Sequence, residues 1–329
     1  MSLALPSTAD AARPRPAPAR RLAAWLAAVL ALYGALTWLF GGEQTLAAAA
    51  RIGLGWIALG LLLTTASFAI RALRWHFLLA SAGARVAPAP GAAIYLAGIG
   101  LTFTPGKLGE TVRSAFLARL GVPVGTSVAA FFVDRLSDVL AVLLIAIAPV
   151  ALLARADGAG WRWLLPLALV FAASLLLRVL LRSAAWPRLV ARLSAHRRLA
   201  RLGDWLTRGG QDFLRMWRPA VAAPSVLASL LAYGLQGAIF AGMVAQVAPA
   251  VSPWLALSIF GAATLAGAAS FVPGAVGAME LALVLMLGAE GVDAASALAA
   301  ALCLRAVTFW YGLVLGAIGL SLAARIRNG

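Results

Sequence analysis

The sequence predicts an all-α polytopic membrane protein with about six full transmembrane helices, two re-entrant helical hairpins and an inverted repeat. Three observations predict this fold. The 329-residue chain is 63% hydrophobic with a mean hydropathy of +0.94. Many of its apolar runs approach the roughly 20 residues that one membrane crossing needs, and a Pro-Gly-X-X-Gly motif interrupts two of them. A soluble domain of this length does not need so much apolar sequence.

Six apolar segments are long enough to cross a bilayer as helices. They are residues 22–40, 52–70, 127–154, 161–181, 225–248 and 294–321. The first of them is longer than the apolar core of a signal peptide, so we expect it to be retained. We expect a disordered cytoplasmic N-terminus over residues 1–20, a transmembrane domain over 21–322 and a cytoplasmic tail over 323–329.

The first interrupted region consists of two short apolar arms. Residues 91–104 and 107–119 lie on either side of Pro105-Gly106. At 1.5 Å per residue each arm covers roughly 20 Å, which is too short for a hydrocarbon core of about 30 Å. The pair is therefore predicted to be a re-entrant hairpin, whose broken backbone must be buried in protein or line a wet cavity.

The second interrupted region forms a hairpin by analogy. Its arms are residues 253–272 and 275–289, on either side of Pro273-Gly274. The first of these arms is long enough to span the membrane alone. Eight full crossings are therefore the alternative to six crossings and two hairpins.

The two interrupted regions are copies of one pattern. They read Pro105-Gly106-Lys107-Leu108-Gly109-Glu110 and Pro273-Gly274-Ala275-Val276-Gly277-Ala278-Met279-Glu280. Downstream, Arg135 recurs as Arg305 with the same offset as the two glutamates. Broken helices at matching positions of two halves are typical of transporters whose site lies where the broken segments meet. The repeats cover about 22–154 and 161–321, and an odd number of crossings in each gives them opposite orientations in the membrane.

The placement of arginine predicts the orientation of the chain. Arginines gather at the ends of predicted spans that share one side, whereas the opposite loops carry few. The first group comprises Arg13, Arg15, Arg20, Arg21, Arg71, Arg74, Arg85, Arg325, Arg327 and nine arginines of residues 182–224. The positive-inside rule then places both termini in the cytoplasm, at a bacterial inner membrane. Six and eight crossings give the same result.

The basic link 182–224 combines these arginines with a near-helical pattern of apolar residues. The apolar positions are Trp186, Leu189, Val190, Leu193, Leu202, Trp205, Leu206, Phe213 and Trp217. This pattern predicts one or two amphipathic helices on the inner leaflet, held by anionic headgroups. A loop whose arginines only set the topology explains the same charges.

Eight charged residues fall inside the predicted motifs or spans. They are Lys107, Glu110, Arg113, Asp134, Arg135, Asp138, Glu280 and Arg305. Their charges sum to zero, against +16 for the chain, and an unpaired charge at a helix centre costs on the order of 2.5–3.5 kcal/mol. We therefore expect them to be paired or hydrated. Glu110 and Arg113 share a helix face, as do Asp134 and Asp138, and the two aspartates need a cation between them. Arg113 or Arg305 is the candidate.

These charges suggest what the site binds. A broken helix exposes free backbone amides at the start of its second arm, which suits an anion such as a lipid phosphate. Lys107 and Arg113 would add to that attraction, whereas Glu280, without a cation in its own arm, suits a cationic group or a proton. A purely structural role, in which buried ion pairs hold helices together, is the alternative for Arg135 and Arg305.

A further arginine pair lies at the predicted end of the second span. Arg71 and Arg74 precede Trp75, and arginine beside tryptophan is common at membrane interfaces. The group is either a lipid-headgroup anchor or an ordinary interfacial anchor.

Several function classes are not indicated. Cys303 is the single cysteine, and His76 and His196 are far apart in sequence, so neither a disulfide nor a metal site is expected. The chain has no Walker loop and no G-x-S-x-G motif. We therefore expect no enzyme activity, no cofactor and no nucleic-acid partner.

The motifs resemble those of a known family. Residues 104–110 followed by Arg113 and residues 133–138 resemble the transmembrane region of lysylphosphatidylglycerol synthases. Residues 71–75 and 273–280, and Arg305 with Thr308 and Trp310, also carry this resemblance. It runs from about residue 20 to 322, and free-standing members are called flippase-like membrane proteins. Lys107 stands where relatives commonly have arginine, and Ala275 stands where a second glycine is common.

The resemblance implies lipid translocation. In the full synthases a separate soluble domain transfers lysine to phosphatidylglycerol, and we expect this protein to lack that domain. We expect a flippase that moves a phospholipid, an aminoacyl-lipid or an isoprenoid or glycolipid, with anionic membrane lipids as partners. The alternatives are a non-transporting scaffold that holds a lipid-modifying enzyme through residues 182–224, and a membrane lipid transferase with Glu110 or Asp134 as its base.

Overall fold

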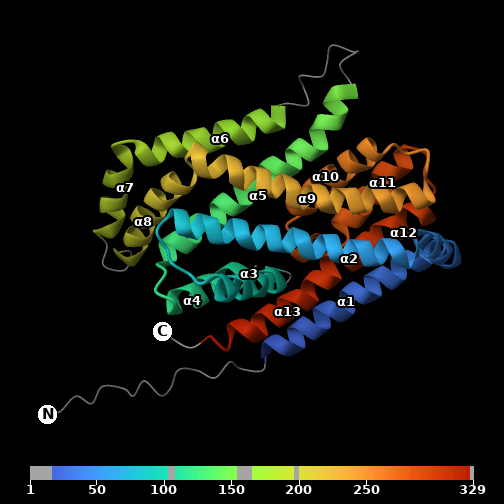
Figure 1. The fold of residues 1–329 in the computed structure, drawn as a ribbon, viewed down its shortest axis with the longest axis horizontal. Helices are drawn as coiled ribbons and strands as arrows, with labels where there is room; N and C mark the ends of the chain where they lie inside the picture. Colours follow the sequence, from blue (N-terminus) through green and yellow to red (C-terminus); the bar gives the residue numbers. More distant parts are fainter. Residues whose placement is uncertain (1–16, 103–107, 154–164, 196–199, 327–329) are drawn as a thin grey trace.

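The computed structural model describes residues 17–102, 108–153, 165–195 and 200–326, and every regular element in these ranges is helical (Figure 1). The first half contains α1 (Ala17–Leu39), α2 (Gly42–Ser81), α3 (Pro88–Thr102), α4 (Leu108–Arg119) and α5 (Val124–Leu153). The second contains α6 (Leu165–Arg182), α7 (Ala185–Ser194), α8 (Ala200–Met216), α9 (Pro219–Val247), α10 (Pro253–Ala269), η4 (Pro273–Ala275), α11 (Ala278–Ala289), α12 (Ala294–Arg305), η5 (Ala306–Trp310) and α13 (Tyr311–Ala323). The predicted all-α class is confirmed.

Among the described residues, four helices are long and apolar enough to cross a membrane. They are Gly42–Ser81, Leu165–Arg182, Pro219–Val247 and the continuous Ala294–Ala323. Each contains or closely matches a predicted span. In α1 the described apolar stretch, Leu26–Leu39, is shorter, and the 30-residue α5 carries three charges in its interior. Whether six or eight segments cross the membrane stays a prediction.

Two predicted boundaries change. α1 begins at Ala17, so the expected disordered terminus is too long by the residues 17–20, and residues 1–16 lie outside the described part. α2 runs well past residue 70 to Ser81 and is broken at Gly53, whose φ of 78° is open mainly to glycine. The group 71–75 therefore lies inside a helix and not at its end.

Each interrupted region is a pair of short helices. α3 packs along α4, and α10 packs along α11 across the turn η4. The breakers therefore split each region as predicted, although the first breaker itself, residues 103–107, lies outside the described part of the chain. Re-entry of the pair from one side of the membrane stays a prediction.

The helices of the two halves pack in a matched pattern. α2 packs against α9, and these are the second long helices of the two halves (Figure 1). The first arm of each hairpin packs against the last helix of the other half: α3 against α13 and α10 against α5. In the same way α2 contacts α12 and α9 contacts α5. A two-fold relation between the halves produces this set of contacts, which supports the predicted repeat.

Small residues allow the hairpins to approach the opposite half closely. A Cβ placed on Gly100 of α3 would lie 2.8 Å from Cα of Gly316 in α13, and one on Gly261 of α10 would lie 2.7 Å from the backbone N of Ala146 in α5. Ala146 and Gly316 are separated by the same 170 residues as Arg135 and Arg305. Close backbone packing of small residues is a common way to join membrane helices.

The basic link folds into two helices, α7 and α8, but part of its apolar face contacts protein. α8 packs along α5, and Phe213 and Trp217 are buried in a core with residues of α2 and α3. Asp212 of α8 accepts a hydrogen bond of 2.6 Å from Thr126 of α5. Trp205, by contrast, is 48% exposed. The predicted amphipathic helices are therefore present, but the apolar residues at the C-terminal end of α8 pack against protein. Contact of the link with the inner leaflet stays a prediction.

Replacing Gly316 with alanine should destabilise the protein, because the added Cβ would overlap Cα of Gly100. We expect the free energy of unfolding to fall by about 1–3 kcal/mol, as in other overpacked cores. Thermal unfolding of the purified protein in detergent measures the change. Gly234→Ala in α9 is the matched control, since nothing lies within 4 Å of its added Cβ. Equal melting temperatures for the two variants would contradict the close contact.

Candidate functional site

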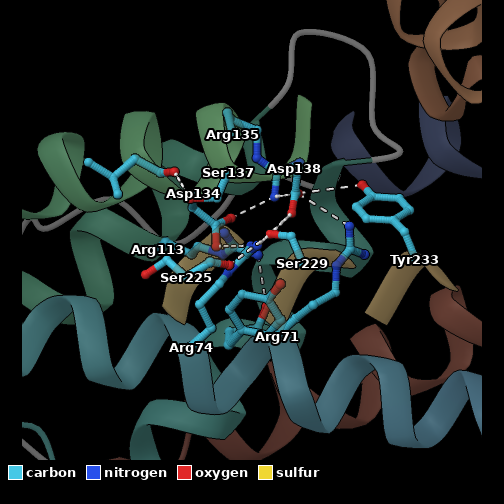
Figure 2. Close-up of polar contacts among 12 residues, drawn as sticks. Arg71, Arg74, Arg113, Asp134, Arg135, Ser137, Asp138, Ser225, Ser229 and Tyr233 are labelled. Carbon is cyan, nitrogen blue, oxygen red and sulfur yellow. Dashed lines mark hydrogen bonds and ion pairs between the residues drawn. The ribbon is translucent and has the colours of Figure 1, made fainter. Parts of the chain in front are cut away.

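The charged residues of α2 and α5 meet in one buried group (Figure 2). We call it the arginine-aspartate cluster, and its members are Arg71, Arg74, Asp134, Arg135 and Asp138. Arg74 lies between the aspartates: its Nη1 is 2.7 Å from Oδ1 of Asp138, and its Nη2 pairs with Oδ1 of Asp134. The prediction of Arg113 or Arg305 as this cation is wrong, because α2 extends far enough to bring its own arginine between them.

Two more arginines complete the cluster. Nη2 of Arg135 is 2.6 Å from Oδ2 of Asp134 and 3.0 Å from Oδ2 of Asp138, although Arg135 itself is 40% exposed in its side chain. Nη2 of Arg71 is 3.3 Å from the same oxygen of Asp138. Three guanidinium groups thus surround two carboxylates. Because arginine stays protonated in proteins, the cluster keeps one positive charge.

Helix α9 supplies hydroxyl groups that the sequence analysis missed. Ser229 Oγ is 3.2 Å from Oδ1 of Asp138 and also bonds to Arg74, and Tyr233 donates a hydrogen bond of 3.4 Å to Oδ2 of Asp138. The Arg71 guanidinium lies 4.3 Å from the centre of the Tyr233 ring. A signal was present, since Ser225, Ser229 and Tyr233 recur every fourth position and so share one face of an apolar helix.

The group 71–75 is not a surface anchor in the structure. Arg71, Arg74 and Trp75 are only 9%, 3% and 2% exposed, and both arginines bind aspartates of α5. The interpretation as an ordinary interfacial anchor is therefore wrong, whereas binding of a lipid headgroup by this group stays a prediction. The error arose because the sequence analysis ended the second span at residue 70. In the structure α2 continues to Ser81, and its last turns lie in the protein interior.

Arg113 reaches the same region from α4. Its side chain is buried, its Nη2 donates a 3.2 Å hydrogen bond to the carbonyl of Tyr95, and its guanidinium lies 4.5 Å from the centre of the Tyr95 ring. A Cβ on Gly98 would overlap Arg113, so glycine at this position of α3 makes room for the arginine. The side chain of Glu110 lies outside the described part, and its predicted pairing with Arg113 stays a prediction.

The second half holds a separate ion pair. Arg305 Nε is 2.9 Å from Oε1 of Glu280, and the hydroxyl of Tyr33 in α1 bonds to the same oxygen. Arg305 Nη2 also donates a 2.6 Å hydrogen bond to the carbonyl of Gly274. Glu280 thus finds in α12 the cation that its own arm lacks.

The second Pro-Gly-X-X-Gly motif bends the backbone through left-handed conformations. Gly274 and Gly277 have φ values of 65° and 81°, and Ala275 has a φ of 55°. A left-handed conformation costs a non-glycine residue roughly 1–2 kcal/mol, so Ala275, two positions after Pro273, is a strained position. The bend leaves the Gly274 carbonyl free of the helix ladder and available to Arg305.

A central cavity of about 280 Å³ lies between the two halves. Four arginines line it, and among the described residues no carboxylate does. These arginines are Arg71, Arg113, Arg135 and Arg305. The acidic partners of Arg71, Arg135 and Arg305 do not line the cavity, and the remaining wall is largely aromatic and apolar. The cavity therefore favours an anion. The sequence analysis predicted a neutral site, because the eight intramembrane charges sum to zero, whereas the cavity wall is positive.

The predicted site residues divide into three groups. Arg113, Arg135 and Arg305 meet at the cavity, and Asp134, Asp138 and Glu280 lie behind it. Pro105, Gly106 and Lys107 lie outside the described residues, whereas Gly109 and Glu110 belong to the first turn of α4. The predicted anion site at the amides after Pro105 therefore stays a prediction. In the described ranges no three His, Cys, Asp or Glu side chains gather as a metal site requires.

Comparison with known proteins agrees with the resemblance seen in the motifs. The family described as "Lysylphosphatidylglycerol synthase TM region" has a model that matches residues 25–316. This range covers both halves of the fold and all the residues that line the central cavity. A search of curated proteins finds no match.

Loss of Arg74 should destabilise the protein strongly. Arg74→Met leaves the buried carboxylates of Asp134 and Asp138 without the cation that separates them, and breaking a buried ion pair costs about 3–5 kcal/mol. Thermal unfolding in detergent checks this. Arg85→Met, at an exposed arginine just beyond α2, should melt like the wild type. A similar melting temperature for both variants would show that Arg74 does not hold the cluster together.

Proposed function

We propose a function from one premise: the chain belongs to the lysylphosphatidylglycerol synthase TM region family, and it is a multi-pass membrane protein. On this premise we propose that it is a flippase that moves an anionic lipid from one leaflet of the bilayer to the other. We place it in a bacterial inner membrane with both termini in the cytoplasm.

The observation that carries the proposal is the charge of the central cavity. Four guanidinium groups line it without a lining carboxylate among the described residues. Guanidinium groups bind phosphate through two parallel charge-assisted hydrogen bonds. A buried excess of positive charge is costly in a membrane protein. A phosphate group that enters the cavity would neutralise part of this excess.

The size of the cavity favours a headgroup as the bound part of the lipid. Its volume of about 280 Å³ is close to the lower end of small-molecule sites, roughly 300–1,000 Å³. A phosphate with a small polar substituent fits this space, and whole acyl chains do not. Phospholipids, aminoacyl-lipids and isoprenoid or glycolipid phosphates share this chemistry.

A second cavity supports a route for the hydrocarbon chain. It has a volume of about 530 Å³, lies between α4, α5 and α8, and shares Arg113 and Phe131 with the central cavity. Its wall is mostly apolar, and at its rim Phe132 and Trp205 are 57% and 48% exposed. A lipid with its phosphate at Arg113 would therefore extend its chain along this second cavity towards the surrounding lipid.

The repeat supports a way to alternate access. Each hairpin packs against the last helix of the other half at a contact of small residues, Gly100 with Gly316 and Gly261 with Ala146. Smooth contacts of this kind allow one half to rock against the other around a fixed central site, as in other repeat transporters. We propose that such rocking opens the central cavity to each leaflet in turn.

One alternative has its own supporting observation. A surface cavity of about 570 Å³ is lined by three arginines, Arg85, Arg208 and Arg215, and by Asp212, at the meeting point of α2, α4 and α8. This basic surface suits an acidic partner, so a scaffold for a lipid-modifying enzyme is the second candidate. The transferase alternative has less support, because both oxygens of Asp134 are held by arginines and a base needs a free oxygen.

Transport in liposomes tests the flippase proposal. We expect the purified wild type to accelerate the movement of fluorescent phosphatidylglycerol between leaflets relative to empty vesicles. Arg113→Gln should slow this movement by roughly 10–150-fold, because a hydrogen bond to a charged group contributes about 1.5–3 kcal/mol. Arg119→Gln, at an exposed arginine of the same helix, is the matched control and should move lipid like the wild type. Wild-type movement no faster than in empty vesicles would refute the proposal.

A further inference from the structure

The acidic residues behind the central cavity differ in how completely they are bonded. Every carboxylate oxygen of Asp134 and Asp138 has at least one arginine partner. Glu280 is fully buried and bonds to Arg305 and Tyr33 through Oε1 alone, and its Oε2 has no hydrogen-bond partner among the described residues. A buried, unpartnered carboxylate oxygen is costly and therefore rare. Among the described acids of this region, Glu280 is thus the one with an unbonded carboxylate oxygen that can accept a proton.

The cation that holds Glu280 also belongs to the central cavity. Arg305 lines the cavity while its Nε bonds to Glu280 at 2.9 Å. Its Nη2 bonds to the Gly274 carbonyl, and its Nη1 faces the sulfur of Met279, a weak acceptor, at 3.9 Å. An anion in the cavity therefore meets a guanidinium that already serves one buried carboxylate.

Among the described residues, few titratable groups other than the cavity arginines Arg71, Arg113 and Arg135 surround this pair. α1 contributes Tyr33, α12 contributes Arg305 and, two positions earlier, the thiol of Cys303, and α10 has no titratable residue. The arginine-aspartate cluster is a separate group whose two carboxylates are already bonded to three guanidinium groups. The protonation state of Glu280 therefore depends mainly on the strength of its ion pair with Arg305.

Binding of a second anion at Arg305 changes this balance. The anion and Glu280 would then compete for the Arg305 guanidinium, while the anion also weakens the attraction that Arg71, Arg113 and Arg135 of the cavity wall exert on the carboxylate. In a region of low dielectric, like charges close together favour protonation of one of them. Uptake of one proton at Oε2 of Glu280 converts the carboxylate to a neutral carboxyl group. Arg305 keeps its charge, and the entering phosphate takes over the pairing. The charges of Glu280 and Arg305 sum to zero before binding, and the charges of neutral Glu280, Arg305 and the bound phosphate sum to zero after it.

We infer that Glu280 is a proton-binding site linked to the cavity, and that the protein takes up one proton for each anionic headgroup bound at Arg305. This inference rests on the proposed flippase function and adds an energy source to it. Because the proton and the anion bind together, a proton gradient across the membrane can drive the lipid in one direction. By reciprocity, the lipid raises the affinity for the proton as much as the proton raises the affinity for the lipid.

Calorimetry of the full chain in detergent tests the coupling. Dihexanoyl-phosphatidylglycerol is titrated in buffers of different ionisation enthalpy, which gives the number of protons taken up per lipid bound. For the wild type we expect one proton, and affinity that tightens about tenfold for each unit by which the pH is lowered across the range of uptake. Glu280→Gln should bind the lipid with no proton uptake and little pH dependence. Glu290→Gln, at an exposed glutamate just beyond α11, is the matched control and should behave like the wild type.

The outcomes separate this inference from the function on which it rests. Binding by the wild type without proton uptake, or uptake that persists in Glu280→Gln, overturns the coupling and leaves lipid binding in place. Absence of binding by the wild type overturns both. If Glu280→Gln fails to fold, Tyr33→Phe replaces it: loss of a donor to the carboxylate should change the pH range over which the lipid binds with proton uptake, and an unchanged range overturns the coupling.

Discussion

The burial of Arg74 between two aspartates is the interaction on which the rest of the structure depends. A guanidinium with no exposed side-chain surface is tolerated in a membrane protein only when carboxylates surround it. Asp134 and Asp138 of α5 meet this need, and Ser229 of α9 bonds to both Arg74 and Asp138. The cluster therefore joins α2, α5 and α9, and its third guanidinium leaves a positive charge that nothing in the cluster neutralises. The anionic preference of the cavity follows from this excess.

The two halves share one architecture and differ in charge. Matching helices pack in matching pairs, and the positions of Ala146 and Gly316 meet the opposite hairpin in the same way. The first half places three arginines on two aspartates, so its carboxylates are saturated. At the cavity, the second half pairs Arg305 with one carboxylate, Glu280, whose Oε2 has no hydrogen-bond partner among the described residues. The two halves thus share their helix packing and differ in their charged residues. The arginine-aspartate cluster of the first half attracts anions and stays paired, whereas the Arg305–Glu280 pair of the second half can exchange its partner for an anion.

Prediction from the sequence succeeded where the signal is local and failed where it depends on a neighbouring helix. Pro273 restricts the backbone and the glycines that follow allow left-handed conformations, whatever surrounds them, so the break between α10 and α11 was predictable. Arg71 and Arg74 were misplaced because the sequence near a helix does not show which charged residue of another helix will pair with it. Their partner Asp138 lies 64 positions from Arg74. Tyr33 was missed for the same reason, since its contact with Glu280 spans 247 positions.

The sequence by itself determined the membrane class, the broken helical hairpins and the doubled pattern, because apolar length, helix breakers and repeated motifs act within a few residues of the chain. Only the tertiary structure decided which charges pair, which carboxylate keeps an unbonded oxygen and that the cavity wall carries arginines alone among charged residues of the described part. The physical reason is that electrostatic energy in a low-dielectric interior depends on distances of a few ångströms between side chains. Packing of α2, α5, α9 and α12 sets those distances.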